Sequence, residues 1–206
     1  MIASQSKSTR VYGQLRRALQ CGRFAPGQRL EPAALADEFD ASLTPVRAAL
    51  HRLHGECLVN DKGREGFYVL LPTEAALRGH YEYMELQLLN ACDKGASPNG
   101  RRNIVPSPPE SIAKATWQLF DTIVRRTPLR DLQHFAQLAN DRLAPIRMAK
   151  QSLVRDGHAE LAELVSAWER ADIARLKSAL RAYHARRREL VPAIVELLND
   201  ARDALH

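Results

Sequence analysis

Apolar and polar positions in the first third of the chain recur at helical spacing. Residues 8–22 carry an apolar stripe at three- and four-residue steps, formed by Val11, Leu15, Ala18 and Leu19. The stretch GRFAPGQ at 22–28 is expected to end this helix. Glycine accepts the left-handed conformation at a helix C-terminus, and Pro-Gly favours a turn. The pattern therefore predicts one amphipathic helix followed by a turn.

A second helical stretch, LADEFDASLTPVRAALHRL at 35–53, contains a break. The DAS sequence at 40–42 interrupts the helix, because Asp and Ser side chains bond the local backbone. Thr44 is the expected N-cap of the next helix and Pro45 its first residue. Two helices joined by a tight turn are therefore predicted, with Arg47 in the first turn of the second.

Two short strands are expected after these helices. Cys57–Val59 and Phe67–Leu71 are apolar runs on either side of a turn region with Asp and Gly, which predicts a hairpin. The hairpin loop carries Lys62 and Arg64. Three helices followed by a basic hairpin define a winged helix-turn-helix, which we assign to residues 1–72.

The remaining chain, residues 73–206, has the pattern of an all-α bundle. A loop rich in Pro, Gly and Asn is expected at 94–109, and Pro145 and Pro192 are expected to kink or split two of the helices. The predicted helices span 74–93, 110–126, 128–153, 157–170 and 172–199. The fold class is therefore mostly α, with an N-terminal winged helix-turn-helix followed by an all-α helical bundle.

Composition narrows the function classes. The 206 residues include 30 Lys and Arg against 24 Asp and Glu, giving a net charge of +6, which suits a polyanionic partner without proving one. Three cysteines without a CxxC pair fit a reducing cytoplasm. We expect neither a signal peptide nor a membrane-spanning helix. No nucleophile elbow, P-loop or dinucleotide loop occurs, so an enzyme is not expected.

The segment from Val11 to about Val69 resembles the DNA-binding half of GntR-type bacterial transcription regulators. The resemblance is carried by GRFAPGQRL at 22–30, LA at 35–36, SLTPVRAAL at 42–50 and Gly66 in the wing. It implies a regulator that binds a pseudo-palindromic operator in double-stranded DNA as a homodimer. The helix that starts near Thr44 would enter the major groove.

Six residues are candidate DNA contacts: Ser42, Thr44, Arg47, Lys62, Arg64 and Gly66. A helix N-terminus carries partial positive charge and free N–H groups, and therefore attracts phosphate. Arg47 can bond guanine or phosphate, and Ser42 and Thr44 can bond phosphate oxygens. Gly66, carried over from the resemblance, would let the wing backbone approach the minor groove.

The chain departs from the family pattern at Leu43, where an arginine is usual, and at Cys57, where glycine is usual. Leu43 is either a tolerated surface leucine or the sign of an altered operator in which it contacts a thymine methyl group. It also supports an alternative: an interaction or scaffold protein that retains a winged helix without sequence-specific DNA binding. His51, His54 and Cys57 suggest a metal by their spacing, but the tail of the recognition helix is the favoured interpretation.

Residues 74–199 resemble the helical FCD effector domain of the FadR-type branch, chiefly in LAELVSAWERADIARLKSALRAYHARRREL at 161–190. In that family, one Asp and three His often hold a metal that helps to bind a carboxylate effector. Carried over one by one, only Asp121 and His184 match the ligand set. Two ligands rarely hold a divalent ion, so a divalent metal is not expected.

The remaining ligand positions hold other residues. Trp117 stands where the pattern has a ligand, and the next histidine should fall near Leu161, where His158 substitutes if the register shifts. The resulting candidates for effector binding are Met84, Trp117, Asp121 and His184.

The effector pocket is expected to differ from that of the family. Met84 and Gln87 stand where the family commonly has Arg and Glu, which indicates an apolar lining from Met84 and aromatic residues. Core packing of these side chains is the favoured alternative. Four arginines in RAYHARRREL at 181–190 indicate either a solvated helix face or an anion-binding lip.

These expectations describe a transcription regulator, with repression as the commoner outcome in the family. A small-molecule effector in the helical domain, with carboxylates as the expected class, would change its operator affinity. The hypothesis for coupling is that the effector moves the two winged helices of a dimer relative to each other through the bundle.

Overall fold

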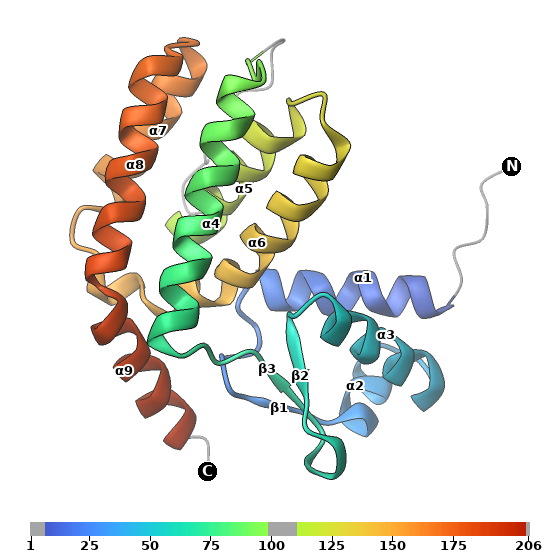
Figure 1. The fold of residues 1–206 in the computed structure, drawn as a ribbon. Helices are drawn as coiled ribbons and strands as arrows, with labels where there is room; N and C mark the ends of the chain where they lie inside the picture. The colour runs from blue at the N-terminus through green and yellow to red at the C-terminus, as the bar shows by residue number, and fades with distance from the viewer. Residues whose placement is uncertain (1–6, 99–110, 205–206) are drawn as a thin grey trace, which may run out of the picture.

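Three helices and a small sheet form the N-terminal part of the protein (Figure 1). The structure, a computed structural model, describes residues 7–98 and 111–204. Helices α1 (Lys7–Gln20), α2 (Pro32–Glu38) and α3 (Leu43–Gly55) enclose an apolar core. The predicted amphipathic stripe of α1 is buried, and α1 packs directly on α3.

The break between α2 and α3 differs in detail from the prediction. Asp40 takes a positive φ of 47°, which ends α2. Ser42, rather than Thr44, is the N-cap residue of α3, and α3 begins at Leu43. The prediction of Thr44 as N-cap and Pro45 as first residue is therefore wrong by two positions. Pro45 still fits, because the first turn of a helix needs no N–H from it.

The sheet has three antiparallel strands, β1 (Arg29–Leu30), β2 (Val59–Asp61) and β3 (Phe67–Val69), in the order β1-β3-β2. The predicted hairpin is present as β2 and β3, although β2 begins where the predicted first strand ends. A short 3-10 turn, η1 (Gly63–Glu65), forms the tip of this wing. Strand β1 was not predicted, because two residues give no recognisable alternation.

A helical domain with a core of its own follows, with α4 to α8 running side by side in Figure 1. Most of the predicted loop at 94–109 lies outside the described residues. The predicted helix over 172–199 is divided at Leu190, and Pro192 lies in the first turn of the next helix, so the expected split at this proline is present. The helices are α4 (Glu74–Asp93), α5 (Ile112–Arg125), α6 (Arg130–Ala149), α7 (Gly157–Glu169), α8 (Ile173–Glu189) and α9 (Val191–Asp203), with the short 3-10 turn η2 (Gln151–Leu153) after α6.

Pro145 does not divide α6, which continues to Ala149. In Figure 1, α1 crosses below the lower end of α6, so the two parts of the protein meet there. None of the helices among residues 7–98 and 111–204 has the length and apolar content needed to cross a membrane.

Candidate nucleic-acid interface and domain junction

A groove lies between the N-terminal half of α3 and the wing. Arg47 of α3 and Arg64 and Gly66 of the wing line it, together with Arg29 of β1 and His51. Its volume is about 370 Å³. Three of the six candidate DNA contacts therefore meet at one surface. Ser42 and Thr44 are exposed beside it at the start of α3, and Lys62 lies at the wing.

The cations of this groove differ in whether they already have partners. Among the described residues, Arg47 and Arg64 form no hydrogen bond or ion pair with protein groups. Lys62, by contrast, lies 3.7 Å from a Glu65 carboxylate oxygen, and Arg29 lies 2.8 Å from Glu31. Arg47 and Arg64 are therefore the groove cations whose donors are available to phosphate or bases.

Backbone geometry explains two positions of the family pattern. Gly66 has φ +94° and ψ −160°, a region that only glycine occupies without strain. Cys57, where the family usually has glycine, has φ +55° two residues after the end of α3. This conformation costs a non-glycine residue conformational free energy, since its Cβ approaches the following carbonyl oxygen.

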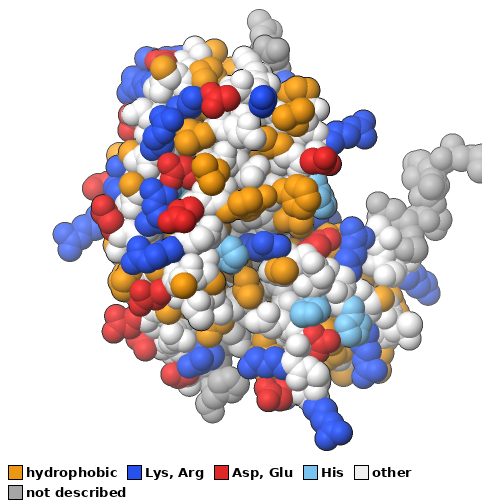
Figure 2. Space-filling view, in the orientation of Figure 1, with side chains coloured by type: hydrophobic (Ala, Val, Ile, Leu, Met, Phe, Trp, Pro, Cys, Tyr) orange, Lys and Arg blue, Asp and Glu red, His pale blue; other side chains and the backbone are white. Residues whose placement is uncertain are grey.

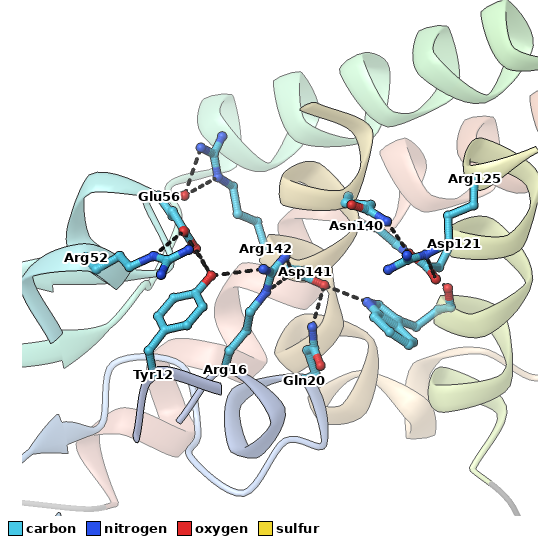
Figure 3. Close-up of polar contacts among 12 residues, drawn as sticks. Tyr12, Arg16, Gln20, Arg52, Glu56, Asp121, Arg125, Asn140, Asp141 and Arg142 are labelled. Atoms are coloured by element: carbon cyan, nitrogen blue, oxygen red, sulfur yellow. Dashed lines mark hydrogen bonds and ion pairs between the residues drawn. The ribbon is translucent and has the colours of Figure 1, made fainter. Parts of the chain in front are cut away.

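The junction between the two parts of the protein centres on Asp141 of α6 (Figure 3). Arg16 of α1 donates to Asp141 Oδ2 over 2.7 Å, and Gln20 donates to Oδ1 over 2.8 Å. Trp117 of α5 donates its indole N–H to Oδ1, also over 2.8 Å. Burial raises the pKa of Asp141, because it outweighs the lowering effect of Arg16 and the other donors. The carboxylate is therefore held at the junction at an electrostatic cost.

A second set of contacts joins the junction to the end of α3 (Figure 3). Tyr12 donates to Glu56, the residue after α3, and accepts from Arg16 over 2.9 Å. Arg142 of α6 donates twice to the Glu56 carbonyl oxygen, over 3.1 and 3.0 Å. Sequence reasoning missed this junction, since its residues lie up to 125 positions apart.

The four effector candidates do not gather around one cavity. Trp117 and Asp121 line a crevice between α1 and the helical domain, where Asp121 pairs with Arg125. Met84 is fully buried in the apolar core. His184 is also buried, and its Nδ1 lies 2.8 Å from the Leu180 carbonyl oxygen.

The residues present do not fit the metal that the FCD resemblance implies. Within the described ranges, no group of three or more His, Cys, Asp and Glu side chains could hold a metal ion. Asp121 accepts hydrogen bonds from Arg125 and Gln137. Burial, with a smaller contribution from nearby arginines, lowers the pKa of His184 to about 3, although the hydrogen bond to the Leu180 carbonyl oxygen opposes this shift. A cation beside His184 would face positive charge, so the donor set disfavours a metal.

Comparison with known proteins identifies the N-terminal domain. Residues 7–69 match the family model of bacterial regulatory proteins of the gntR family. A curated relative, the uncharacterized HTH-type transcriptional regulator YdhC of Bacillus subtilis (strain 168), is 34% identical over 58 residues. That match covers 28% of this chain and 26% of YdhC. Residues 7–69 are therefore a GntR-type DNA-binding domain, and the chain spans about a quarter of the length of YdhC.

Solved structures extend the likeness to the whole fold. A crystal structure described as a candidate transcriptional regulator GntR from Rhodococcus sp. RHA1 superposes with a TM-score of 0.75 at 17% identity, covering 92% of this chain and 99% of that one. E. coli McbR/YncC gives a TM-score of 0.69 at 18% identity over the same shares. The predicted fold class is thus confirmed. The matched family and YdhC are transcriptional regulators, not enzymes, as expected.

Proposed function

We propose that this protein is a transcription regulator that binds a pseudo-palindromic operator in double-stranded DNA as a homodimer and acts in the cytoplasm. A small-molecule effector in the helical domain changes its operator affinity, and repression is the expected outcome. The observation that carries the proposal is the pair of unpartnered arginines, Arg47 and Arg64, in the groove between α3 and the wing of a GntR-type domain.

An exposed apolar surface on the helical domain supports the homodimer. Four of its large apolar side chains are at least 39% exposed, and three of them line one shallow hollow on α4 and α6. The four are Tyr83, Leu86, Leu129 and Phe135. Figure 2 shows hydrophobic side chains gathered over α4 and α6. Contiguous apolar surface of this kind commonly marks an interface, and a second copy of the chain would bury it.

The contacts of helix α6 support the proposal that effector binding in the helical domain changes the position of the DNA-binding domain. Asp141 and Arg142 of α6 hold α1 and the end of α3, as described above. Arg147, two turns further along α6, donates to Asn140, and Asn140 donates to the Trp117 carbonyl oxygen over 2.9 Å. An effector that displaces the C-terminal end of α6 would therefore change the placement of the winged helix.

The test is selection of tight binders from random duplex DNA by the full chain. We expect the wild type to enrich a two-fold-symmetric motif, and Arg47→Ala to lose this enrichment. Arg181→Ala is the matched control, because Arg181 is exposed on α8, away from the groove. An absence of enrichment at low salt, with and without candidate effectors, would contradict the proposal.

The residue Leu43 favours a second candidate function, that of a scaffold protein without sequence-specific DNA binding. Leu43 is the first residue of α3 and is 45% exposed, so its side chain is available at the position where the family usually has arginine. Leu43→Arg separates the two functions. If the wild type already binds one motif, the variant shifts its preference. If only the variant enriches a motif, the scaffold function is supported.

A further inference from the structure

A small cavity in the helical domain is surrounded by buried cations. Its volume is about 40 Å³, and α5, α6, η2, α7 and α8 contribute to its lining. Arg147 of α6, Lys150 after α6 and Arg187 of α8 line it and are 3%, 3% and 4% exposed. Thr116 and Tyr183 also line the cavity. Apolar residues such as Ile112 and Val154 make up the rest of the lining, so the cations are set in an otherwise apolar wall.

The three cations retain donors that no protein group satisfies. Arg147 bonds Asn140 through Nη1, yet its Nε and Nη2 are buried without a partner. Arg187 pairs with Glu160, while its Nε has no partner. The Lys150 ammonium likewise has none and lies 5.1 Å from the centre of the Tyr81 ring. Buried polar atoms are nearly always hydrogen-bonded, so four orphaned donor atoms on three adjacent cations indicate a missing partner.

The charge balance specifies the sign of that partner. Glu160 is the carboxylate that faces the group, and Arg186 shares it with Arg187. At least two positive charges on the cavity wall are therefore uncompensated when all three side chains are protonated. Burial, together with Arg187 and Arg147, lowers the pKa of Lys150 well below its usual value. An anion in the cavity would reverse this effect and satisfy the orphaned donors.

We infer that the cavity binds a small anion with two negative charges, a dicarboxylate or a phosphate, held directly by Arg147, Lys150 and Arg187 without a metal ion. Arginine donors suit the planar geometry of carboxylate and the oxygens of phosphate. The cavity has room for a phosphate or for one carboxylate group, so the rest of a dicarboxylate would extend beyond it. Of the two readings of RAYHARRREL, the anion-binding one thus applies to Arg187.

The same residues connect the anion to the domain junction. Arg147 bonds Asn140, which bonds Trp117, and the Trp117 indole bonds Asp141. The inference therefore deepens the proposed function by naming the effector class. The effect of the anion on DNA affinity rests on the proposed function. Binding of the anion to the cavity does not depend on it.

The test measures thermal unfolding of the full chain without DNA, in buffer containing EDTA. The probes are malonate, succinate and inorganic phosphate at millimolar concentration, against sodium chloride of equal ionic strength and neutral malonamide. We expect at least one dianion to raise the unfolding midpoint by roughly 5 °C once it exceeds its dissociation constant about a hundredfold. Chloride and malonamide should leave the unfolding midpoint unchanged. Comparison of malonate and succinate with phosphate shows whether the cavity prefers carboxylate or phosphate.

Two variants complete the test. Lys150→Met should abolish the anion-dependent shift, while Arg155→Met, which changes an exposed cation five residues later, should retain it. No shift with any dianion, an equal shift in Lys150→Met, or a shift that needs added Zn²⁺ would overturn the inference. Since no DNA is present, failure here is distinct from failure to select an operator. Addition of the stabilising anion to the operator-bound protein then tests whether DNA affinity changes.

Discussion

The Arg16 guanidinium of α1 lies 2.5 Å from the Asp141 carboxylate of α6, and this ion pair joins the DNA-binding domain to the helical domain. The Asp141 side chain is 2% exposed, whereas the Arg16 side chain is 27% exposed. The carboxylate thus carries most of the desolvation, while the guanidinium keeps contact with water. Removal of the buried carboxylate from such an ion pair is therefore expected to lower the stability of the fold more than removal of the partly exposed guanidinium.

Asp141→Ala is expected to destabilise the protein by roughly 2–4 kcal/mol, because it leaves donors of Arg16, Gln20 and Trp117 without an acceptor. The measurement is urea unfolding followed by tryptophan fluorescence, which reports on the Trp117 environment. Asp121→Ala is the control. Its partner Arg125 is largely exposed on the same helix, so we expect a loss of about 1 kcal/mol or less. Equal losses in both variants would contradict a special role for the junction.

Arg64→Ala should lower the salt dependence of DNA binding. If Arg64 contacts one phosphate, the slope of log K against log salt should fall in magnitude by about one, with affinity reduced similarly for all sequences.

Arg47→Ala should instead cost about 1–3 kcal/mol of binding free energy at one base position and relax specificity there, if Arg47 contacts guanine. Binding titrations over a salt series measure both. Arg181→Ala should change neither quantity, and a change there would show that the effect is one of net charge.

Local signals in the sequence were sufficient for the elements that carry their own start and stop residues. Helix 74–93 was predicted with its observed bounds, and in the structure Thr73 caps it by accepting from the Ala76 N–H. Where signals were weak, the prediction failed. Strand β1 is held only by its pairing with β3. Helical periodicity continues across Leu190, so the exact boundary between α8 and α9 was missed, although Pro192 indicated a break there.

The sequence predicted the candidate DNA-contact residues but neither the anion cavity nor the junction at Asp141. The candidate DNA-contact residues lie within 25 positions of one another, so motif and local structure place them together. The anion cavity depends on the packing of α6 against α8, which places Arg147 and Lys150 opposite Arg187. In the sequence these are ordinary helix cations, and only burial distinguishes them from solvated ones. The junction at Asp141 depends in the same way on contacts between distant segments.

Cys57→Gly should stabilise the protein by roughly 0.5–1 kcal/mol, because glycine adopts the φ of +55° without the cost of a Cβ. The turn itself is kept by backbone bonds from Cys57 N to His54 O and from Leu58 N to Leu53 O. Urea unfolding measures the difference. Cys21→Gly is the control, since Cys21 is an exposed cysteine whose φ is not positive. A gain in the control, or no gain at Cys57, would exclude relief of backbone strain.

Lys150→Met should stabilise the anion-free protein at neutral pH, because it removes a buried cation whose ammonium has no partner. The size of the gain should depend on pH. Since folding lowers the pKa of Lys150, the unfolded chain binds more protons below pH 10.5, and the wild type gains stability as the pH rises toward that value.

The advantage of the Lys150→Met variant should therefore shrink on going from pH 7.5 to pH 9.5, by up to about 1.4 kcal/mol per pH unit. Urea unfolding of both proteins across this range provides the measurement, with Arg155→Met as a variant that should show no such trend. A saturating dianion should remove the advantage at neutral pH, because it supplies the partner that Lys150 lacks. A constant difference at every pH would mean that Lys150 stays protonated in the folded protein and that another group neutralises it.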